Sequence, residues 1–307
     1  MQQFVLRRLL GAIPVILAII TIVFVVLRVA IPGDPVYILA GDTASPELIE
    51  RIRQKYGLDR SVVEQYVIFM GNALRGDLGN SLKFGEPVID LISKAFPYTA
   101  LLTVLSVSAG TCIGILVGII TAVRSGTWVD RVSMVLVVLL NALPTFWLGI
   151  ILILIFSVGL RMLPVEGSST WRHFVLPVVT LSVGQAALIA RLTRAGLLEM
   201  LRADYIRTAR AKGLVERRVV LLHALKNTLI PIVTIVGLSV GGLLGGAVIT
   251  ESIFGLPGVG RLTISAIADL DYPVIQGGVL LVAVSFVLVN LAVDLLYVLI
   301  DPRIQYR

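Results

Sequence analysis

The chain has 307 residues, of which 57% are hydrophobic and only 15% are charged, with a formal net charge of +7 and a mean hydropathy of +0.96. Soluble domains carry about 25% charged residues, so this composition excludes an ordinary water-soluble fold and predicts that much of the apolar surface faces lipid. The basic residues lie between hydrophobic runs, which indicates membrane topology rather than a nucleic-acid partner, and a single cysteine excludes an internal disulfide.

Six uncharged runs are long enough, or nearly long enough, to cross a bilayer, which takes about 20 residues of helix. In chain order they are 9–27, 95–123, 132–160, 173–190, 227–250 and 272–293. Backbone groups in lipid must be satisfied within the chain, so each run is predicted to be one helix, and solid apolar blocks do not fit the alternation of a β-barrel. Two arginines precede the first run as in a signal peptide, but the run is too long and no cleavage pattern follows it, which predicts an uncleaved span. The predicted fold class is an all-α integral membrane protein with six transmembrane helices.

Residues 1–94 are interpreted as the first transmembrane helix plus a long extracytoplasmic connection, and residues 95–307 as a five-helix core. Within the connection, Ser45-Pro46-Glu47 combines an N-cap residue, a proline at the first helical position and an acid in the first turn. Gly57 is the expected end of that helix. A second short helix is predicted over 61–74.

The basic residues predict which side of the membrane holds the termini, because short connections rich in Lys and Arg stay in the cytoplasm. An even number of spans places both termini on one side, and that side carries 15 Lys and Arg against 11 on the other. Eight of those 11 lie in 28–94, a connection too long for the charge bias to act. Both termini are therefore predicted to be cytoplasmic.

Residue patterns for catalysis do not stand out in the sequence. It has no G-x-x-x-x-G-K-[ST] phosphate loop, and its two histidines are 50 residues apart, which argues against a histidine metal site. The chain is therefore predicted not to be an enzyme, and no catalytic, cofactor-binding or metal-ligating residue is assigned.

Charged residues within the spans are scarce. Arg28 lies near the outer end of the first span, and Asp294 lies near the inner end of the last, where a pair with a basic residue is expected and a proton relay is the alternative. A porter driven by ions or protons is expected to place ionisable groups nearer the middle of the bilayer. This distribution favours a transporter whose energy comes from a partner.

The segment 191–226 is the longest connection on the predicted cytoplasmic side and carries nine Lys and Arg. Much of it is predicted to be helical, with Gly213 as a helix stop before a sharp turn. Ala209 and Ala211 have little bulk, which is expected to let another protein surface approach closely. The alternative is a basic stripe that lies on anionic lipid headgroups.

The stretch 204–214, with the sequence DYIRTARAKGL, resembles the cytoplasmic EAA loop of binding-protein-dependent ABC importer permeases, in the form found in the dipeptide/oligopeptide/nickel branch. Aligned on Gly213, Arg207-Thr208-Ala209 stands where the general pattern has Glu-Ala-Ala, so only the second alanine and the glycine match. Other motifs of that branch cover essentially the whole chain: Arg7-Arg8-Leu9, Ile31-Pro32-Gly33-Asp34-Pro35, Gly57-Leu58-Asp59, Gln65-Tyr66, Gly76-Asp77-Leu78-Gly79, Leu229-Ile230-Pro231, Glu251-Ser252-Ile253-Phe254, Pro257-Gly258-Val259-Gly260-Arg261, Asp271-Tyr272-Pro273 and Asp301-Pro302-Arg303.

The resemblance implies a type I ABC importer transmembrane domain in a bacterial inner membrane, with a coupling helix near 204–218. Its implied partners are a second related permease, two ATP-binding subunits that bind ATP and Mg²⁺, and an extracytoplasmic solute-binding protein. The residues expected to couple the chain to the ATPase are Arg207, Thr208, Ala209, Arg210, Lys212 and Gly213.

The solute is expected to be small and is most often a di- or oligopeptide in this branch. Nickel, glutathione, a sugar or an opine remain open, because specificity lies largely in the binding protein. The rival interpretation from another class is a secondary transporter or channel that needs no ATPase, and a membrane enzyme is a third.

Overall fold

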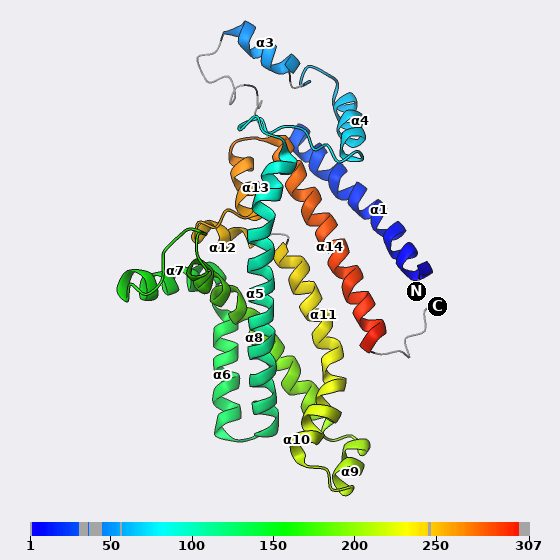
Figure 1. Cartoon of the computed structure of the whole chain (residues 1–307), viewed down its shortest axis with the longest axis vertical. Coiled ribbons are helices and arrows are strands. Elements are labelled where there is room, and N and C mark those ends of the chain that lie inside the picture. The colour runs from blue at the N-terminus through cyan, green and yellow to red at the C-terminus, as the bar shows by residue number, and fades with distance from the viewer. Residues whose placement is uncertain (1, 31–35, 37–44, 56, 245–246, 301–307) are drawn as a thin grey trace.

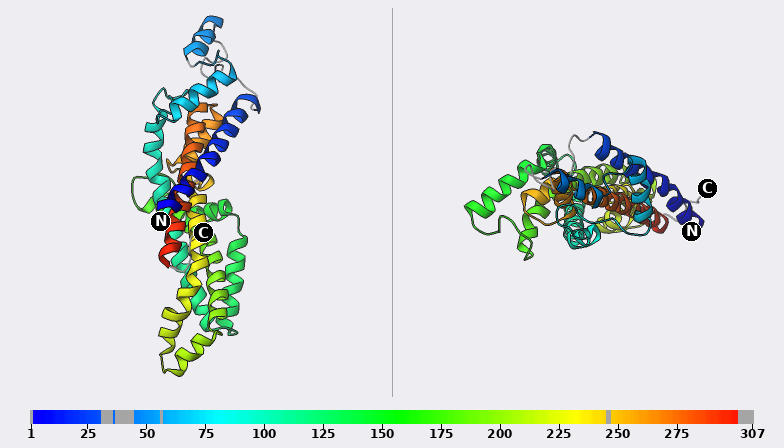
Figure 2. Two further views of the ribbon diagram at one scale, coloured as in Figure 1. Left: turned by 90° about the vertical axis from the view of Figure 1, so that its right-hand side faces the viewer. Right: turned by 90° about the horizontal axis from the view of Figure 1, so that it is seen from above.

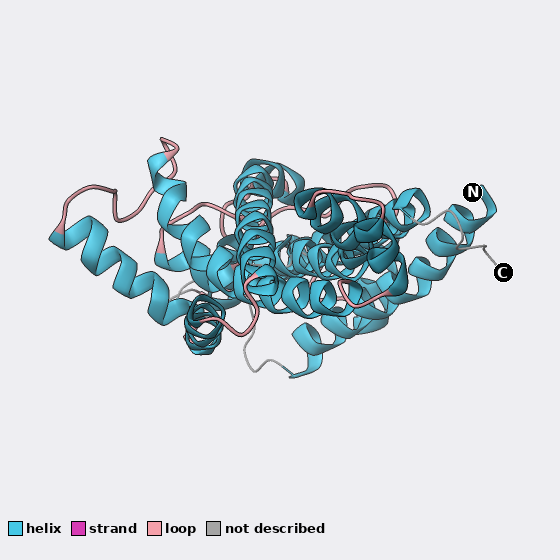
Figure 3. Cartoon of the chain, turned by 90° about the horizontal axis from the view of Figure 1, so that it is seen from below, coloured by secondary structure: helices cyan, strands magenta, loops and turns pink. Residues whose placement is uncertain are grey.

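The computed structural model describes residues 2–30, 36, 45–55, 57–244 and 247–300 (Figure 1). Its elements are helices, and Figure 3 shows only helices and loops in the described part. They are α1 (Gln2–Val25) with its π-helical extension η1 (Val26–Ala30), α3 (Pro46–Lys55), α4 (Val62–Ala73), α5 (Val88–Val123), α6 (Trp128–Ala142), α7 (Thr145–Leu152) with η2 (Ile153–Gly159), α8 (Arg172–Met200), α9 (Asp204–Ala211), α10 (Glu216–Arg218) with η3 (Val219–Ala224), α11 (Leu225–Leu244), α12 (Val248–Ile253), α13 (Val259–Ala268) and α14 (Tyr272–Ile300). The motifs at 31–35 and 301–303 lie outside the described residues.

Five helices in the described ranges are long and apolar enough to cross a membrane. The bent pair of α6 and α7–η2 makes a sixth if it is counted as one span. That pair corrects the prediction of one continuous helix over 132–160, because the chain bends by 100° at the break. Leu143, at the end of α6, has extended backbone angles (φ −74°, ψ 129°) and precedes Pro144. A proline disfavours the helical conformation of the residue before it, which explains the break.

The run at 227–250 is also not a single helix. Its helix begins earlier than predicted, because α10 and η3 lead into α11 without a break, and it ends at Leu244. Val248 already starts α12, and residues 245–246 lie outside the described part. The glycine-rich sequence at this point has low helix propensity, which favours an interruption.

The two short helices predicted between the first and second spans are confirmed as α3 and α4. Gly57 follows α3 with a left-handed backbone (φ +64°), which glycine adopts without strain. At the start of α4, Ser61 and Glu64 form a capping box: the Ser61 hydroxyl oxygen accepts from the Glu64 amide, and the Glu64 carboxylate accepts from the Ser61 amide at 2.9 Å. The hydrogen bonds from the Ser61 hydroxyl and amide hold the pKa of Glu64 below its usual value.

The centre of the fold is the long contact between α5 and α8, which run side by side in Figure 1. Three glycines of α5 spaced four residues apart, Gly110, Gly114 and Gly118, face α8. A Cβ atom at Gly114 would lie 2.7 Å from the backbone oxygen of Ala186, and one at Gly118 would lie 2.5 Å from Cβ of Thr193. Small residues at this spacing let two membrane helices pack with their backbones close together.

The helices give the molecule two ends, with α9 at one and α3, α4 and α13 at the other (Figures 1 and 2). We call these the α9 end and the α13 end. Helix α1 packs along α14, and Arg8 pairs with Asp294 at 3.1 Å. The prediction that Asp294 pairs with a basic residue at a helix end is therefore confirmed.

Candidate functional site

Helix α9 forms the tip of the α9 end, between the end of α8 and the start of α10 (Figure 1). It stops at Gly213, whose φ of +77° lies in the left-handed region. The Gly213 amide donates to the Arg210 carbonyl at 2.9 Å, and the Leu214 amide donates to the Ala209 carbonyl at 3.3 Å. This is the Schellman pattern of a helix end, so the prediction of a glycine stop here is confirmed.

One face of α9 is buried against the chain itself. Ile206 is fully buried and Ala209 is 8% exposed, in a cluster with Leu197, Val219 and Ala224 from α8 and η3. Ala209 is thus in contact with the chain's own helices, and the close approach of another protein surface at this residue stays a prediction. Its small size lets α9 lie close to its own neighbours.

Polar contacts fasten α9 to the helices that follow it. The Arg210 guanidinium donates twice to the Glu216 carboxylate, from Nε at 3.0 Å and from Nη2 at 2.7 Å, and these bonds raise the pKa of Arg210. The Tyr205 hydroxyl accepts from Nδ2 of Asn227, at the start of α11, at 2.9 Å. These contacts join α9 to α8, α10, η3 and α11.

The other face of α9 is exposed and basic. Arg207, Thr208, Ala211, Lys212 and Gly213 all lie on the surface. The Arg207 guanidinium lies 3.4 Å from the Asp204 carboxylate, and exposed pairs of this kind add little stability. Of the six residues expected to couple the chain to a partner, Arg207, Thr208, Lys212 and Gly213 are thus available for contact, while Arg210 is engaged internally and Ala209 is buried.

A second ion pair lies at the α9 end and joins α6 to α8. Arg194 Nε donates to Asp130 Oδ1 at 2.7 Å and Arg194 Nη2 donates to Oδ2 at 2.8 Å, while the Gly126 amide donates to Oδ2 at 3.0 Å. The Asp130 side chain is only 5% exposed. The sequence gives no signal for this pair, because its members lie 64 residues apart just outside two predicted spans.

At the α13 end, Asp271 fastens the segment before α5 to the turn between α13 and α14. Its carboxylate accepts from the Ser81 hydroxyl, from the Leu82 amide at 3.0 Å and from the Lys83 amide at 3.2 Å. Lys83 also pairs with Asp269 at 2.6 Å. The connection between α4 and α5 and the connection between α13 and α14 thus form one surface.

Glu251 holds α12, α13 and α5 together at the same end and is fully buried. It accepts from the Thr99 hydroxyl at 2.6 Å and from the Arg261 amide at 2.9 Å, while Thr99 Oγ1 accepts from the Val259 amide at 2.9 Å. Gly258 packs so close to this carboxylate that no side chain fits there. The Glu-Ser-Ile-Phe and Pro-Gly-Val-Gly-Arg motifs are therefore parts of one structural junction.

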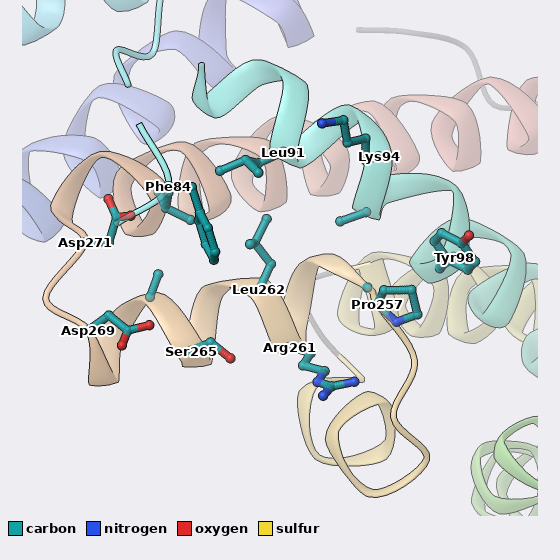
Figure 4. A pocket seen from close by; sticks show the side chains of 14 residues that line it. Phe84, Leu91, Lys94, Tyr98, Pro257, Arg261, Leu262, Ser265, Asp269 and Asp271 are labelled. Atoms are coloured by element: carbon teal, nitrogen blue, oxygen red, sulfur yellow. The ribbon is translucent and has the colours of Figure 1, made fainter. Parts of the chain in front are cut away.

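A cavity of about 580 Å³ lies beside this junction. Figure 4 shows Phe84, Leu91 and Leu262 grouped in it, with Lys94 and Arg261 toward opposite edges. Its lining is mostly apolar. The cavity is a hollow in the surface formed jointly by the two connections.

Comparisons with known proteins agree with this architecture. The family model of the binding-protein-dependent transport system inner membrane component matches residues 114–306, and the model of the N-terminal part of such membrane components matches residues 1–103. The glutathione transport system permease protein GsiC of Escherichia coli (strain K12) is 43% identical over 307 residues, and that of Pectobacterium atrosepticum is 45% identical; both alignments cover 100% of each chain.

Solved structures show the same fold at low sequence identity. A chain of the inward-facing MetNI methionine ABC transporter has a TM-score of 0.56 and 20% identity, and it aligns over 69% of this chain and 97% of its own length. A chain of an amino acid ABC transporter has a TM-score of 0.50, 19% identity and coverages of 70% and 95%. With full-length relatives and a family model that matches more than half of its residues, the chain belongs to the family of binding-protein-dependent transport system inner membrane components, as an ABC importer permease of the peptide/nickel branch.

Proposed function

We propose that this permease forms half of the translocation pathway of an importer for a peptide-type solute, and that α9 is the helix through which ATPase subunits move it. The observation that carries the proposal is the construction of α9: a buried face fixed to α8 and α11, and an exposed basic face at the tip of the molecule. A partner that binds one conformation of α9 better than another shifts the conformations of the attached spans. As a permease the chain is not an enzyme, and ATP is hydrolysed in separate subunits.

The proposed complex contains a second related permease, two ATP-binding subunits that hold ATP and Mg²⁺, and a solute-binding protein. In this assembly residues 95–307 supply the core of the pathway, with α9 and the following turn over 204–218 as the coupling element. Residues 1–94 supply the first span and the connection that faces the binding protein. The surface that Asp271 and Lys83 hold together supports this last role, because it joins the two largest connections of the α13 end.

A peptide-type solute is supported by the full-length relatives, which are named as glutathione transport permeases. The alternative of a secondary transporter draws little support from Asp294, because that carboxylate is already paired with Arg8. We therefore expect transport to depend on ATP rather than on an ion gradient.

Reconstitution tests the function directly. Proteoliposomes that contain this chain, its partner permease and the ATP-binding subunits are expected to accumulate glutathione or a dipeptide only when ATP faces the ATPase and the binding protein is on the other side. A non-hydrolysable ATP analogue serves as the matched control and is expected to abolish accumulation. Uptake by the chain without its ATPase, driven by an ion gradient, would establish the secondary-transporter alternative.

We further propose that the α9 end, with both termini, faces the cytoplasm, as the bias of Lys and Arg in the short connections indicates. In a Cys112→Ala background, single cysteines at the exposed positions Ser45 and Ser169 are expected to react with an impermeant thiol reagent added to intact spheroplasts. Cysteines at Ser125 and Thr208, which are equally exposed at the α9 end, are expected to react only after lysis. Labelling of Thr208→Cys in sealed cells would reverse the orientation.

A further inference from the structure

A second cavity, of about 310 Å³, lies at the α13 end in a different place from the coupling helix and from the hollow in Figure 4. It is enclosed by the end of α1, by the short helices α3 and α4, and by the first turns of α14. Its size lies at the lower end of the range for small-molecule sites, about 300–1,000 Å³. An amino acid or a short peptide is of suitable size for it.

The lining of this cavity is polar, unlike that of the first. Two guanidinium groups, from Arg28 and Arg60, a carboxylate from Asp77 and the amides of Gln65 and Gln276 all border it. These residues come from four separate segments of the chain. Such a convergence of charged and amide groups in one concave site is typical of recognition of a small polar ligand.

Two of the amides present unpaired atoms. Gln276 is only 6% exposed, and its Nε2 has no hydrogen-bond partner among the described residues. Gln65 donates from Nε2 to the Arg60 carbonyl at 2.8 Å, which fixes the amide so that the buried Oε1 is the atom without a partner in the described part of the chain. Buried polar groups in native proteins are almost always paired. A ligand with both acceptors and donors satisfies this donor and this acceptor, whereas a simple anion satisfies only the donor.

Two of the three charged groups, Arg28 and Asp77, have contacts within the chain that orient them, while Arg60 and Asp77 are both exposed. The Arg28 guanidinium lies 4.9 Å from the ring centre of Tyr272 and 5.7 Å from that of Phe24, and such stacking orients its planar donors. The Asp77 carboxylate accepts from the Gly79 amide at 2.9 Å through Oδ1. Two cations and one carboxylate around a cavity complement a ligand that has a carboxylate and an ammonium group.

We propose that this cavity binds a small zwitterionic solute, an amino acid or a short peptide with a free carboxylate and a free amine. The arginines and Gln276 bind the carboxylate, while Asp77 and the Gln65 carbonyl oxygen accept from the amine. Because Arg60 and Gln65 belong to the α3–α4 segment and Arg28 and Gln276 belong to α1 and α14, the bound solute fastens that segment to the spans. The site thus adds solute recognition by the permease itself to the proposed transport function.

The test uses the purified complex in nanodiscs, without binding protein or ATP, and measures binding of the dipeptide Ala-Ala by calorimetry. Saturable binding is expected, and the carboxamide Ala-Ala-NH₂ is expected to bind about tenfold more weakly, because it lacks the carboxylate that the guanidinium groups recognise. Inorganic phosphate at the same concentration is expected not to displace Ala-Ala. Displacement by phosphate would overturn the proposal in favour of a general anion site, of the kind that also binds lipid phosphates.

Two variants locate the binding. Arg60→Gln is expected to weaken Ala-Ala binding about tenfold while leaving Ala-Ala-NH₂ binding nearly unchanged, and Gln276→Leu is expected to weaken both. Arg51→Gln, on the exposed surface of α3 and outside the cavity, is the matched control and is expected to bind as the parent does. No saturable binding, or binding unchanged in both Arg60→Gln and Gln276→Leu, would overturn the inference. Either result together with normal ATP-driven uptake would leave the proposed transport function intact.

Discussion

Replacing Gly213 with valine is expected to lower solute uptake by about five- to thirty-fold in the reconstituted complex. Gly213 has a left-handed backbone, in which a β-branched residue is strained by about 1–2 kcal/mol. Among the described residues beyond Gly213 and its neighbours in the chain, no atom lies within 4 Å of where its Cβ would stand, so the cost arises from the backbone and not from a clash. The turn between α9 and α10 relaxes to relieve the strain, which displaces the exposed face that we propose to dock on the ATPase.

Gly213→Asn is the matched control, because asparagine tolerates the left-handed region far better than valine. Uptake and ATP hydrolysis are measured in the same proteoliposomes, and both are expected to remain near normal in the asparagine variant. In the valine variant uptake is expected to fall, and ATP hydrolysis is expected to be no longer stimulated by loaded binding protein. Equal and normal uptake in both variants would show that the shape of this turn does not matter for coupling.

Ala211→Trp tests the same docking face by bulk instead of strain. Ala211 is exposed on α9, so a tryptophan there leaves the chain's own packing intact and obstructs only a partner. Ala209→Trp, two residues earlier, is expected to disturb the cluster around Leu197 and Val219 and to destabilise the permease itself.

Replacing Arg194 with methionine is expected to destabilise the permease by about 3 kcal/mol. The change leaves the Asp130 carboxylate buried, and among the described residues the Gly126 amide remains as its hydrogen-bond donor. Removing one member of a buried ion pair typically costs about 3–5 kcal/mol. We place the effect at the low end, because the arginine side chain is 28% exposed. Thermal unfolding of the purified complex is expected to shift down by several degrees.

Arg131→Met serves as the control, since Arg131 is exposed and its charge acts on the Asp130 carboxylate less than the hydrogen-bonded Arg194 does. Substitutions of exposed residues usually change stability by less than about 0.5 kcal/mol. The unfolding temperature of Arg194→Lys is expected to lie between those of Arg194→Met and Arg131→Met, because lysine keeps the charge but lacks the planar guanidinium that binds both carboxylate oxygens. If Arg194→Met and Arg131→Met unfold at the same temperature, the Asp130 pair does not hold α6 to α8.

The spans follow from the sequence because lipid imposes one strong requirement, a long apolar helix. The break at Pro144 does not follow as easily, since Pro97, Pro177 and Pro231 lie inside unbroken helices. A proline in a membrane helix is tolerated when neighbouring groups satisfy the freed carbonyl, and that depends on packing that a single sequence does not state.

The position of α9 follows from the sequence, but its contacts with the rest of the chain do not. A basic segment that ends at a glycine identifies α9 and its stop. The burial of Ala209 and the pairing of Arg210 with Glu216 depend on how the chain turns after Gly213, because Glu216 lies six residues beyond Arg210, further than helix neighbours. The second cavity was out of reach of sequence reasoning, since Arg28, Arg60 and Gln276 meet only through tertiary structure.

The contact between α9 and an ATPase is measured most directly by a photo-crosslinking amino acid at Thr208, an exposed position on α9. In membranes that contain the whole complex, irradiation is expected to join Thr208 to an ATP-binding subunit. The same probe at Ser169, in the loop between η2 and α8 whose Gly167 amide donates to the Phe254 carbonyl, is expected to join none. Crosslinks from Thr208 to lipid alone, with an intact and active complex, would contradict a coupling role for α9 and would indicate a basic helix that lies on the membrane surface.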